Sequence, residues 1–145
     1  MGQTIRHEFS YNHPPEVIWI YLTDPDLLAQ WLMPSDFKAE VGHHFMFKTK
    51  PMKKLGFDGL IYCQVLEVIP NEKLVYSWKG WMSKENPSLD SMVIWTLSPT
   101  PTGSKLLLEH RGFKGIKNYL SYFIMNMGWK KIGDRIATLI KKLTS

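Results

Sequence analysis

Apolar and polar residues alternate with a period of two through the middle of this chain of 145 residues. Runs of this kind cover residues 4–11, 37–50, 59–70, 73–81, 91–99 and 104–113. Such alternation is typical of β-strands that bury one face. Short turn-forming stretches, among them Pro70 and Asn71, separate the later runs, so consecutive strands are predicted to pair antiparallel. Gly42 predicts a bulge or corner in the second run.

Two short helices are predicted directly after the first strand. Pro14 and Pro15 suit a helix start, because proline fixes φ and its missing N–H needs no partner in the first turn. Asp24 is placed to cap a second helix over residues 24–31, in which Trp31 is the apolar anchor.

The C-terminal part of the chain has a helical period instead. Its apolar residues recur at spacings of three and four, namely Met125, Trp129, Ile132, Ile136, Leu139 and Leu143. They define one apolar side of a long helix. Gly128 and Gly133 lower the helix propensity of this segment, and they would let the helix bend or let a strand approach it closely.

These elements predict an α+β fold. A curved sheet with an aromatic face needs a cover, and the terminal helix is the only predicted element long enough to supply one. We therefore expect a single domain over residues 1–145, in which a curved antiparallel sheet wraps around the long C-terminal helix and two short helices follow the first strand.

Composition and charge exclude several classes of protein. Hydrophobic residues make up 44% of the chain and charged residues 21%, as in folded globular proteins. The net charge is +5, but the basic residues are scattered and no nucleic-acid-binding motif occurs, so no nucleic-acid partner is expected. Cys63 is the single cysteine and cannot form an internal disulfide, and no apolar run reaches the length of a membrane span. We expect a cytoplasmic protein that does not insert into membranes.

Large rings dominate the positions that are expected to face inward from the sheet. Such residues either fill a solid core or line a pocket for an apolar ligand. The residues predicted to line such a pocket are Phe45, Phe47, Tyr62, Leu66, Tyr76, Trp78, Val93, Trp95, Leu108, His110, Met125, Trp129 and Ile132.

Few residues have chemistry of their own. His110, in register with Leu106 and Leu108, is expected to face inward, where it would bind a ligand oxygen, act as an acid or base, or serve as a structural imidazole. His43 and His44 are adjacent on a strand and point to opposite faces, so they cannot hold one metal ion. No nucleophile elbow, phosphate loop or dinucleotide fingerprint occurs. We therefore assign no catalytic residue, metal or cofactor, and we leave enzymatic activity open with none expected.

Five segments carry a resemblance to a known family. They are PPEVIWIYLTDPDLLAQWLMP, FKAEVGHHFMF, GLIYCQVLEVIPNEKLVYSW, SMVIWTLSPTPTGSKLLLEHRGF and MGWKKIGDRI. In this order they resemble the START-like, or SRPBCC, superfamily, whose helix-grip fold is shared by the birch-pollen allergens. Within the superfamily they are most similar to the family named for the activator of the heat-shock-protein-90 ATPase. Gly42 and His43 stand where that family often has paired glycines.

The resemblance implies a cavity between the sheet and the terminal helix, open at one end. We expect a small domain, a monomer or a homodimer, that binds an apolar or aromatic small molecule such as a lipid in this cavity. One alternative is a co-chaperone-like protein-interaction module of the stress response, with a chaperone as partner. The other is a cyclase- or dehydratase-like enzyme that uses the same pocket, with His110 and Tyr76 as polar participants.

Overall fold

The computed structural model describes residues 3–49, 59–83, 86–113 and 115–144, and for residues 3, 81–83, 86–89, 113, 115–125 and 127 it describes the backbone alone. The elements are β1 (Gln3–Tyr11), α1 (Pro15–Thr23), α2 (Pro25–Trp31), β2 (His44–Lys48), β3 (Leu60–Ile69), β4 (Lys73–Ser83), β5 (Asn86–Thr100), β6 (Gly103–Phe113) and α3 (Gly115–Thr144). The predicted order of one strand, two short helices, a run of strands and a long terminal helix is confirmed. The strand predicted over residues 37–50 is shorter, because it begins only at His44, after the turn at Gly42.

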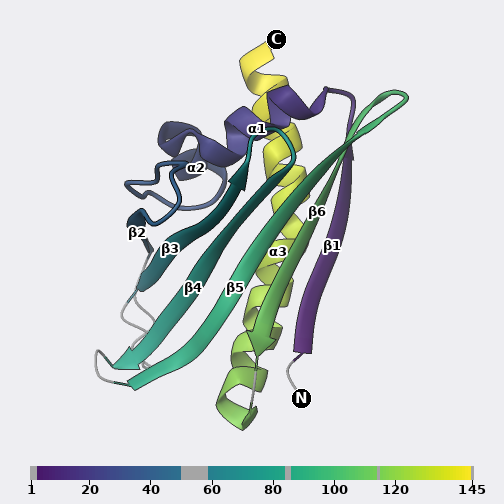
Figure 1. The fold of residues 1–145 in the computed structure, drawn as a ribbon. Helices are drawn as coiled ribbons and strands as arrows, with labels where there is room; N and C mark the ends of the chain where they lie inside the picture. The colour runs from purple at the N-terminus through teal and green to yellow at the C-terminus, as the bar shows by residue number, and fades with distance from the viewer. Residues whose placement is uncertain (1–2, 50–58, 84–85, 114, 145) are drawn as a thin grey trace.

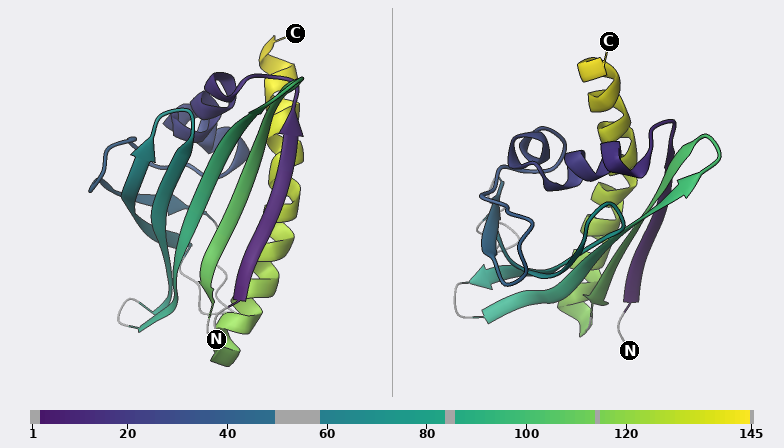
Figure 2. Two further views of the ribbon diagram at one scale, coloured as in Figure 1. Left: turned by 45° about the vertical axis from the view of Figure 1, so that its right-hand side comes forward. Right: turned by 45° about the horizontal axis from the view of Figure 1, so that its top comes forward.

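The strands form one antiparallel sheet in the order β1-β6-β5-β4-β3-β2. The sheet is curved, and α3 runs along one of its faces (Figure 1). The short helices α1 and α2 lie across one end of the sheet, beside the C-terminal part of α3 (Figure 2). This arrangement is the α+β helix-grip fold that the sequence predicts. In the described part of the chain, no helix is both long and apolar enough to cross a membrane.

The two short helices begin as the sequence predicts. Pro14 is the N-cap residue of α1, with extended backbone angles, and Pro15 occupies the first helical position. The carboxylate of Asp24 accepts hydrogen bonds from the backbone N–H groups of Asp26 (2.8 Å) and Leu27 (3.4 Å), which have no partner within the helix. The indole N–H of Trp31 donates to the carbonyl oxygen of Tyr21 at 2.7 Å, so the end of α2 is fixed to α1.

The helix α3 approaches β1 closely at Gly133. A Cβ atom added there would overlap the ring of Phe9, and the carbonyl oxygen of Gly133 accepts a hydrogen bond from the hydroxyl of Tyr11 at 3.2 Å. This confirms one of the two roles predicted for the glycines, the close approach of a strand. A Cβ at Gly128 would meet nothing within 4 Å. Leu143, predicted on the apolar side, is 51% exposed because the last turn of α3 extends past the packed layer, and Ile140 is buried there instead.

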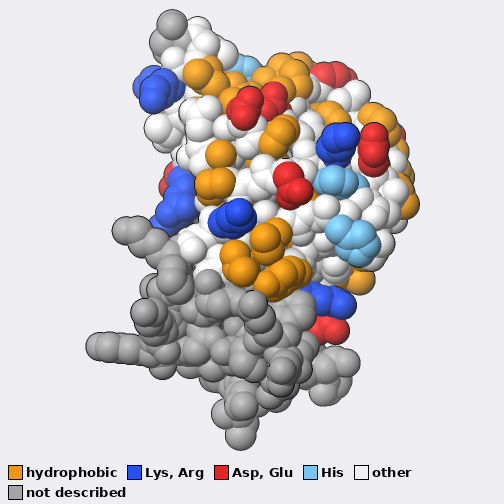
Figure 3. Space-filling model, turned by 90° about the vertical axis from the view of Figure 1, so that its left-hand side faces the viewer, with side chains coloured by type: hydrophobic (Ala, Val, Ile, Leu, Met, Phe, Trp, Pro, Cys, Tyr) orange, Lys and Arg blue, Asp and Glu red, His pale blue; other side chains and the backbone are white. Residues whose placement is uncertain are grey.

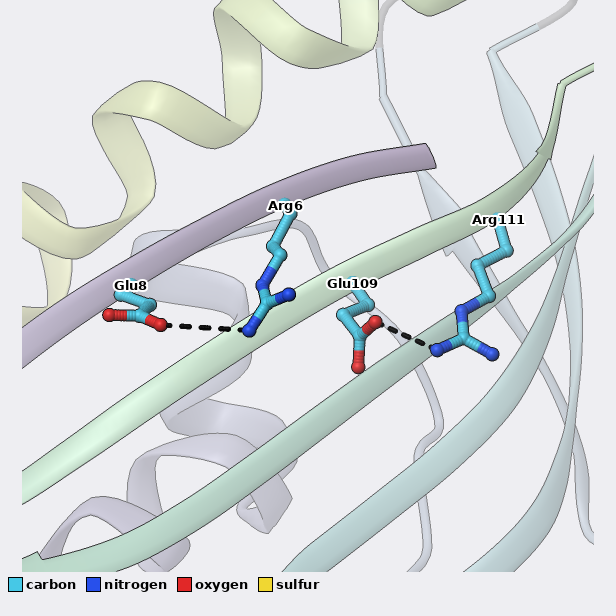
Figure 4. Close-up of polar contacts among 4 residues, drawn as sticks. All are labelled: Arg6, Glu8, Glu109 and Arg111. Carbon is cyan, nitrogen blue, oxygen red and sulfur yellow. Dashed lines mark hydrogen bonds and ion pairs between the residues drawn. The ribbon is translucent and has the colours of Figure 1, made fainter. Parts of the chain in front are cut away.

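The face of the sheet away from α3 is polar over β1 and β6. Arg6 and Glu8 extend from β1, and Glu109 and Arg111 from β6 (Figure 4). The guanidinium of Arg111 lies 2.8 Å from the carboxylate of Glu109, and that of Arg6 lies 3.8 Å from the carboxylate of Glu8. These surface pairs contribute little to stability. They identify the opposite face, under α3, as the face that can form a core or a site.

Candidate functional site

Three tryptophans join the sheet to α3. The ring of Trp129, on α3, lies 5.3 Å from that of Trp78 on β4 and 5.7 Å from that of Trp95 on β5, measured between ring centroids. Each of these side chains is 1% exposed. The spacings are those of favourable edge and tilted aromatic contacts. Period-two alternation on the strands and the helical period of α3 place the rings on facing surfaces, which is why the sequence pattern could predict the cluster.

A hydrogen-bonded relay lies beside these rings and connects α3 with three strands. The indole N–H of Trp129 donates to Nδ1 of His110 at 2.9 Å. The other ring nitrogen, Nε2, lies 2.7 Å from the hydroxyl of Ser91, and this hydroxyl lies 2.8 Å from the carbonyl oxygen of Trp78, to which it donates. His110 is fully buried and Ser91 nearly so. We call Trp129, His110, Ser91 and Trp78 the buried relay.

The geometry of the buried relay determines the tautomer of His110. An indole nitrogen can only donate, so Nδ1 must be the unprotonated acceptor and Nε2 must carry the hydrogen. That hydrogen points to the Ser91 oxygen, whose own hydrogen goes to the carbonyl of Trp78. Burial lowers the pKa of His110 from 6.5 to about 3, because the charged form would lose its hydration. At neutral pH the imidazole is therefore uncharged, and both of its nitrogens are engaged by the protein.

A second group of rings surrounds Tyr76. Its ring centroid lies 5.3 Å from that of Phe45 and 6.2 Å from those of Phe37 and Phe47. The Tyr76 hydroxyl accepts a hydrogen bond from the indole N–H of Trp95 at 2.8 Å. Burial raises the pKa of this hydroxyl, so it stays protonated in the folded protein. Phe37 is not among the residues predicted to face inward; it lies in the predicted strand run 37–50, but the structure places it in the connection between α2 and β2.

Most residues predicted to line a pocket do lie on the inner face. Those buried there are Phe45, Phe47, Tyr76, Trp78, Val93, Trp95, Leu108, His110, Trp129 and Ile132. The side chain of Met125 lies outside the described residues. Whether the inner-face residues bind a ligand stays a prediction, because their burial is equally compatible with a packed core.

The predictions for Tyr62 and Leu66 on β3 are wrong, because the inward residues of this strand are the odd-numbered ones as far as Val65. Ile61, Cys63 and Val65 are buried, whereas Tyr62 between them faces the other way and is only partly buried. Leu66 is 43% exposed. Leu66 points outward with Tyr62 by regular alternation. The strand pairing shifts only between Val65 and Glu67, and beyond this shift Val68 packs against the core.

Two polar residues of the inner face escaped prediction. Ser91 stands in register with Val93 and Trp95, so period-two alternation contained the signal for its inward position. Asn126 precedes Trp129 by three residues on α3, and its side-chain oxygen lies 2.9 Å from Nε2 of His7 on β1. Such a contact joins residues 119 positions apart, and no local pattern predicts it.

The described residues include no group of three or more His, Cys, Asp or Glu side chains placed to hold a metal ion. His43 and His44 have different surroundings. Nε2 of His43 lies 2.9 Å from the backbone oxygen of Asp36, while His44 is exposed on the edge strand.

Comparison with known proteins identifies the family that this fold and inner face define. Residues 12–141 match the family described as Activator of Hsp90 ATPase homolog 1-like protein. The match covers most of the sequence, so the chain belongs to this family, whose helix-grip fold is that of the START-like superfamily. No curated protein matched the sequence.

Solved structures share the fold over nearly the whole chain. Protein MLL2253 from Mesorhizobium loti is 36% identical, with 97% of this chain and 98% of that chain covered and a TM-score of 0.84. Protein BH1534 from Bacillus halodurans is 26% identical, with 92% of this chain and 94% of that chain covered and a TM-score of 0.73. DynU16, from the dynemicin biosynthetic locus, is 20% identical with a TM-score of 0.72, and the match covers 95% of this chain and 47% of that chain.

Proposed function

We propose that the protein binds an apolar or aromatic small molecule between the sheet and α3, against the rings of Trp78 and Trp129. The observation that carries this proposal is the wide inner face of aromatic side chains with a neutral polar relay at its centre. Pockets for small molecules combine such apolar and aromatic walls with a few fixed polar groups. Membership in a family with a small ligand-binding fold supports the same function.

The packing of the rings suggests which end of the inner face receives the ligand. On the side of α2, the ring of Trp31 lies 5.8 Å from that of Trp95, which in turn contacts Trp129, so this end is filled by side chains. On the other side of Trp129, toward the beginning of α3, stands the partly buried pair of His7 and Asn126. We therefore place the ligand between this pair and the buried relay, with its apolar body on the rings.

The buried relay has a supporting role in this proposal. Both nitrogens of His110 already have partners, and the imidazole is neutral at physiological pH. The neutral imidazole of His110 fixes the orientation of the Trp129 ring and adds no net charge to the inner face against which the ligand would lie. Acid–base catalysis by His110 would require breaking these hydrogen bonds, which favours binding over an enzymatic use of the same space.

Ligand titration of two matched variants tests the proposal. Asn126→Trp places an indole in the proposed space, and Lys130→Trp places the same indole on the exposed side of α3, one turn further along. Fatty acids, polyketides and flavonoids are screened by thermal shift and native mass spectrometry. A ligand at about 100 times its Kd raises the free energy of unfolding by about 2.7 kcal/mol. We expect the wild type and Lys130→Trp to bind the ligand and Asn126→Trp to lose binding. Equal binding by all three proteins refutes the proposed location of the ligand. If no compound binds to any of them, the proposed ligand-binding function is refuted.

A second candidate is a protein-interaction module that acts on a chaperone ATPase. The description of the family favours it, and so do three exposed apolar side chains, those of Leu66, Ile69 and Met92. Measuring the ATPase rate of the host's Hsp90-type chaperone separates the two functions. An interaction through the outer face predicts that Met92→Asp abolishes stimulation while Asn126→Trp keeps it. An unchanged ATPase rate with the wild-type protein excludes this candidate.

A further inference from the structure

A surface pocket of about 630 Å³ lies at the β2 edge of the sheet. Its polar lining consists of Ser35 and Asp36, from the connection after α2, and of His44 and Lys48, from β2. A volume of this size suits a small organic molecule. Figure 3, which faces this edge, shows histidine, acidic and basic side chains around a group of apolar ones. We call this the edge pocket.

Backbone contacts hold the two walls of the edge pocket together. The carbonyl oxygen of Pro34 accepts a hydrogen bond from the N–H of Lys48 at 3.1 Å. The carboxylate of Asp36 accepts one from the N–H of Met46 at 3.3 Å. The outer edge of β2 is thereby bonded to the connection, so the pocket exists before any ligand arrives.

The hydroxyl of Ser35 is a polar group in the wall of the edge pocket that the protein itself leaves unpaired. Its oxygen is buried and has no hydrogen-bond partner among the described residues. A buried hydroxyl without a partner is destabilising and rare in native proteins. Ser35 lines the pocket, so a rotation of its side chain toward the pocket would let a polar atom of a bound molecule supply the missing partner.

The charges of the edge pocket indicate what that molecule carries. Asp36 and Lys48 line the same pocket, yet neither forms an ion pair with the other or with any other residue in the described ranges. Two opposite charges therefore face one space without neutralising each other. A molecule with one cationic and one anionic group complements them, whereas a singly charged molecule would leave one of them uncompensated.

The body of the molecule follows from the rest of the lining. Phe45, Met46 and Tyr62 contribute two rings and a thioether. Rings stack on aromatic side chains, and thioethers pack well against them. We propose that the edge pocket binds a small aromatic zwitterion, with its ammonium group toward Asp36, its carboxylate toward Lys48 and its ring against Met46 and Tyr62.

The test uses three indole compounds that differ only in charge. L-tryptophan has both charged groups, tryptamine lacks the carboxylate and indole-3-propionate lacks the ammonium group. Binding to the full chain is followed by NMR, through the backbone amides of His44 and Met46 and the methyl group of Met46. We expect L-tryptophan to shift these signals with a Kd of about 1 mM or lower, and each of the other two to bind about tenfold more weakly or worse.

Matched variants separate this site from a nonspecific surface effect. Ser35→Ala, Asp36→Asn and Lys48→Gln each weaken L-tryptophan binding, while Glu40→Gln and Lys38→Gln, exposed neighbours outside the lining, leave it unchanged. Thermal unfolding of each variant verifies that it is folded. Equal binding of the three compounds, no shift with any of them, or binding that survives both Asp36→Asn and Lys48→Gln overturns the proposal. The proposed function is unaffected by this outcome, because Asn126→Trp tests a different space.

Discussion

Removing the indole of Trp129 tests the packing of α3 on the sheet. This side chain is 1% exposed, and its ring contacts those of Trp78, Trp95 and His110 at centroid distances of 5.3, 5.7 and 5.9 Å. Truncating a buried aromatic side chain to alanine lowers the free energy of unfolding by about 3–5 kcal/mol. Because single domains are stable by only about 5–15 kcal/mol, Trp129→Ala should reduce stability by a large fraction.

Trp129→Phe separates the hydrogen bond from the packing. Phenylalanine keeps most of the apolar ring but cannot donate to Nδ1 of His110, which is then left as a buried acceptor without this donor. Such a loss lowers the free energy of unfolding by about 1–3 kcal/mol. Phenylalanine should therefore fall between the wild type and alanine.

Urea unfolding followed by far-UV circular dichroism measures these differences by linear extrapolation. Leu143→Ala is the control on the same helix, since Leu143 is 51% exposed and its truncation should change stability by no more than about 0.5 kcal/mol. A Trp129→Ala variant that unfolds at the wild-type urea midpoint would show that α3 does not cover the sheet, and the account of the fold would be wrong.

Three further predictions concern α3, His110 and α2. Gly128→Ala should stabilise the protein by up to about 1 kcal/mol, because the added Cβ enters open space. Gly133→Ala should destabilise it by about 1–3 kcal/mol, because the added Cβ would overlap the ring of Phe9. Thermal unfolding of the two variants measures both effects. The pKa of His110 is about 3 in the folded protein and 6.5 in the unfolded chain, so between these pH values only the unfolded chain binds the extra proton. The free energy of unfolding should therefore decrease as the pH falls from about 6.5 toward 3, by at most about 1.4 kcal/mol per pH unit. His110→Gln should have a shallower pH dependence in urea unfolding than both the wild type and the control His13→Gln, and identical slopes would contradict the buried, neutral state of His110. Asp24→Ala should lower the free energy of unfolding by about 0.5–2 kcal/mol through loss of the cap of α2, and an unchanged urea midpoint would show that the cap contributes nothing.

Much of the fold could be predicted because local patterns determine it. The alternation in β4, β5 and β6 correctly placed Trp78, Trp95 and His110 on the inner face. The proline and aspartate signals at the starts of α1 and α2 correspond to real helix starts, because they act through the first turn alone.

The failures have a different physical origin. Period-two alternation separates the two faces of a strand without telling which one is inward, and on β3 the face of Tyr62 and Leu66 is the outer one. The pairing shift between Val65 and Glu67 then brings Val68 to the core side, so one alternation does not hold along the whole strand. Ring size does not identify the inward residue here: Tyr62 faces outward, whereas the smaller Cys63 next to it occupies the core.

The polar contacts could not be predicted because they depend on tertiary placement. His110 was identified as an inward imidazole, but its bonds to Ser91 and Trp129 join positions 19 residues away on either side in the sequence. The edge pocket likewise combines the connection after α2 with β2 and β3, and no motif marks Ser35 or Asp36 as neighbours of Lys48 and Tyr62.

The most direct test of the proposed function locates a bound ligand by intermolecular NOE measurements. Selectively labelled protein, saturated with a compound that stabilises it in the thermal-shift screen, is examined for contacts between the ligand and the indole protons of Trp78 and Trp129. Ligand binding under α3 predicts NOEs to both indoles and none to the methyl group of Met92, which lies on the outer face and is 38% exposed. NOEs to Met92 without any to Trp78 or Trp129 would contradict the proposed site.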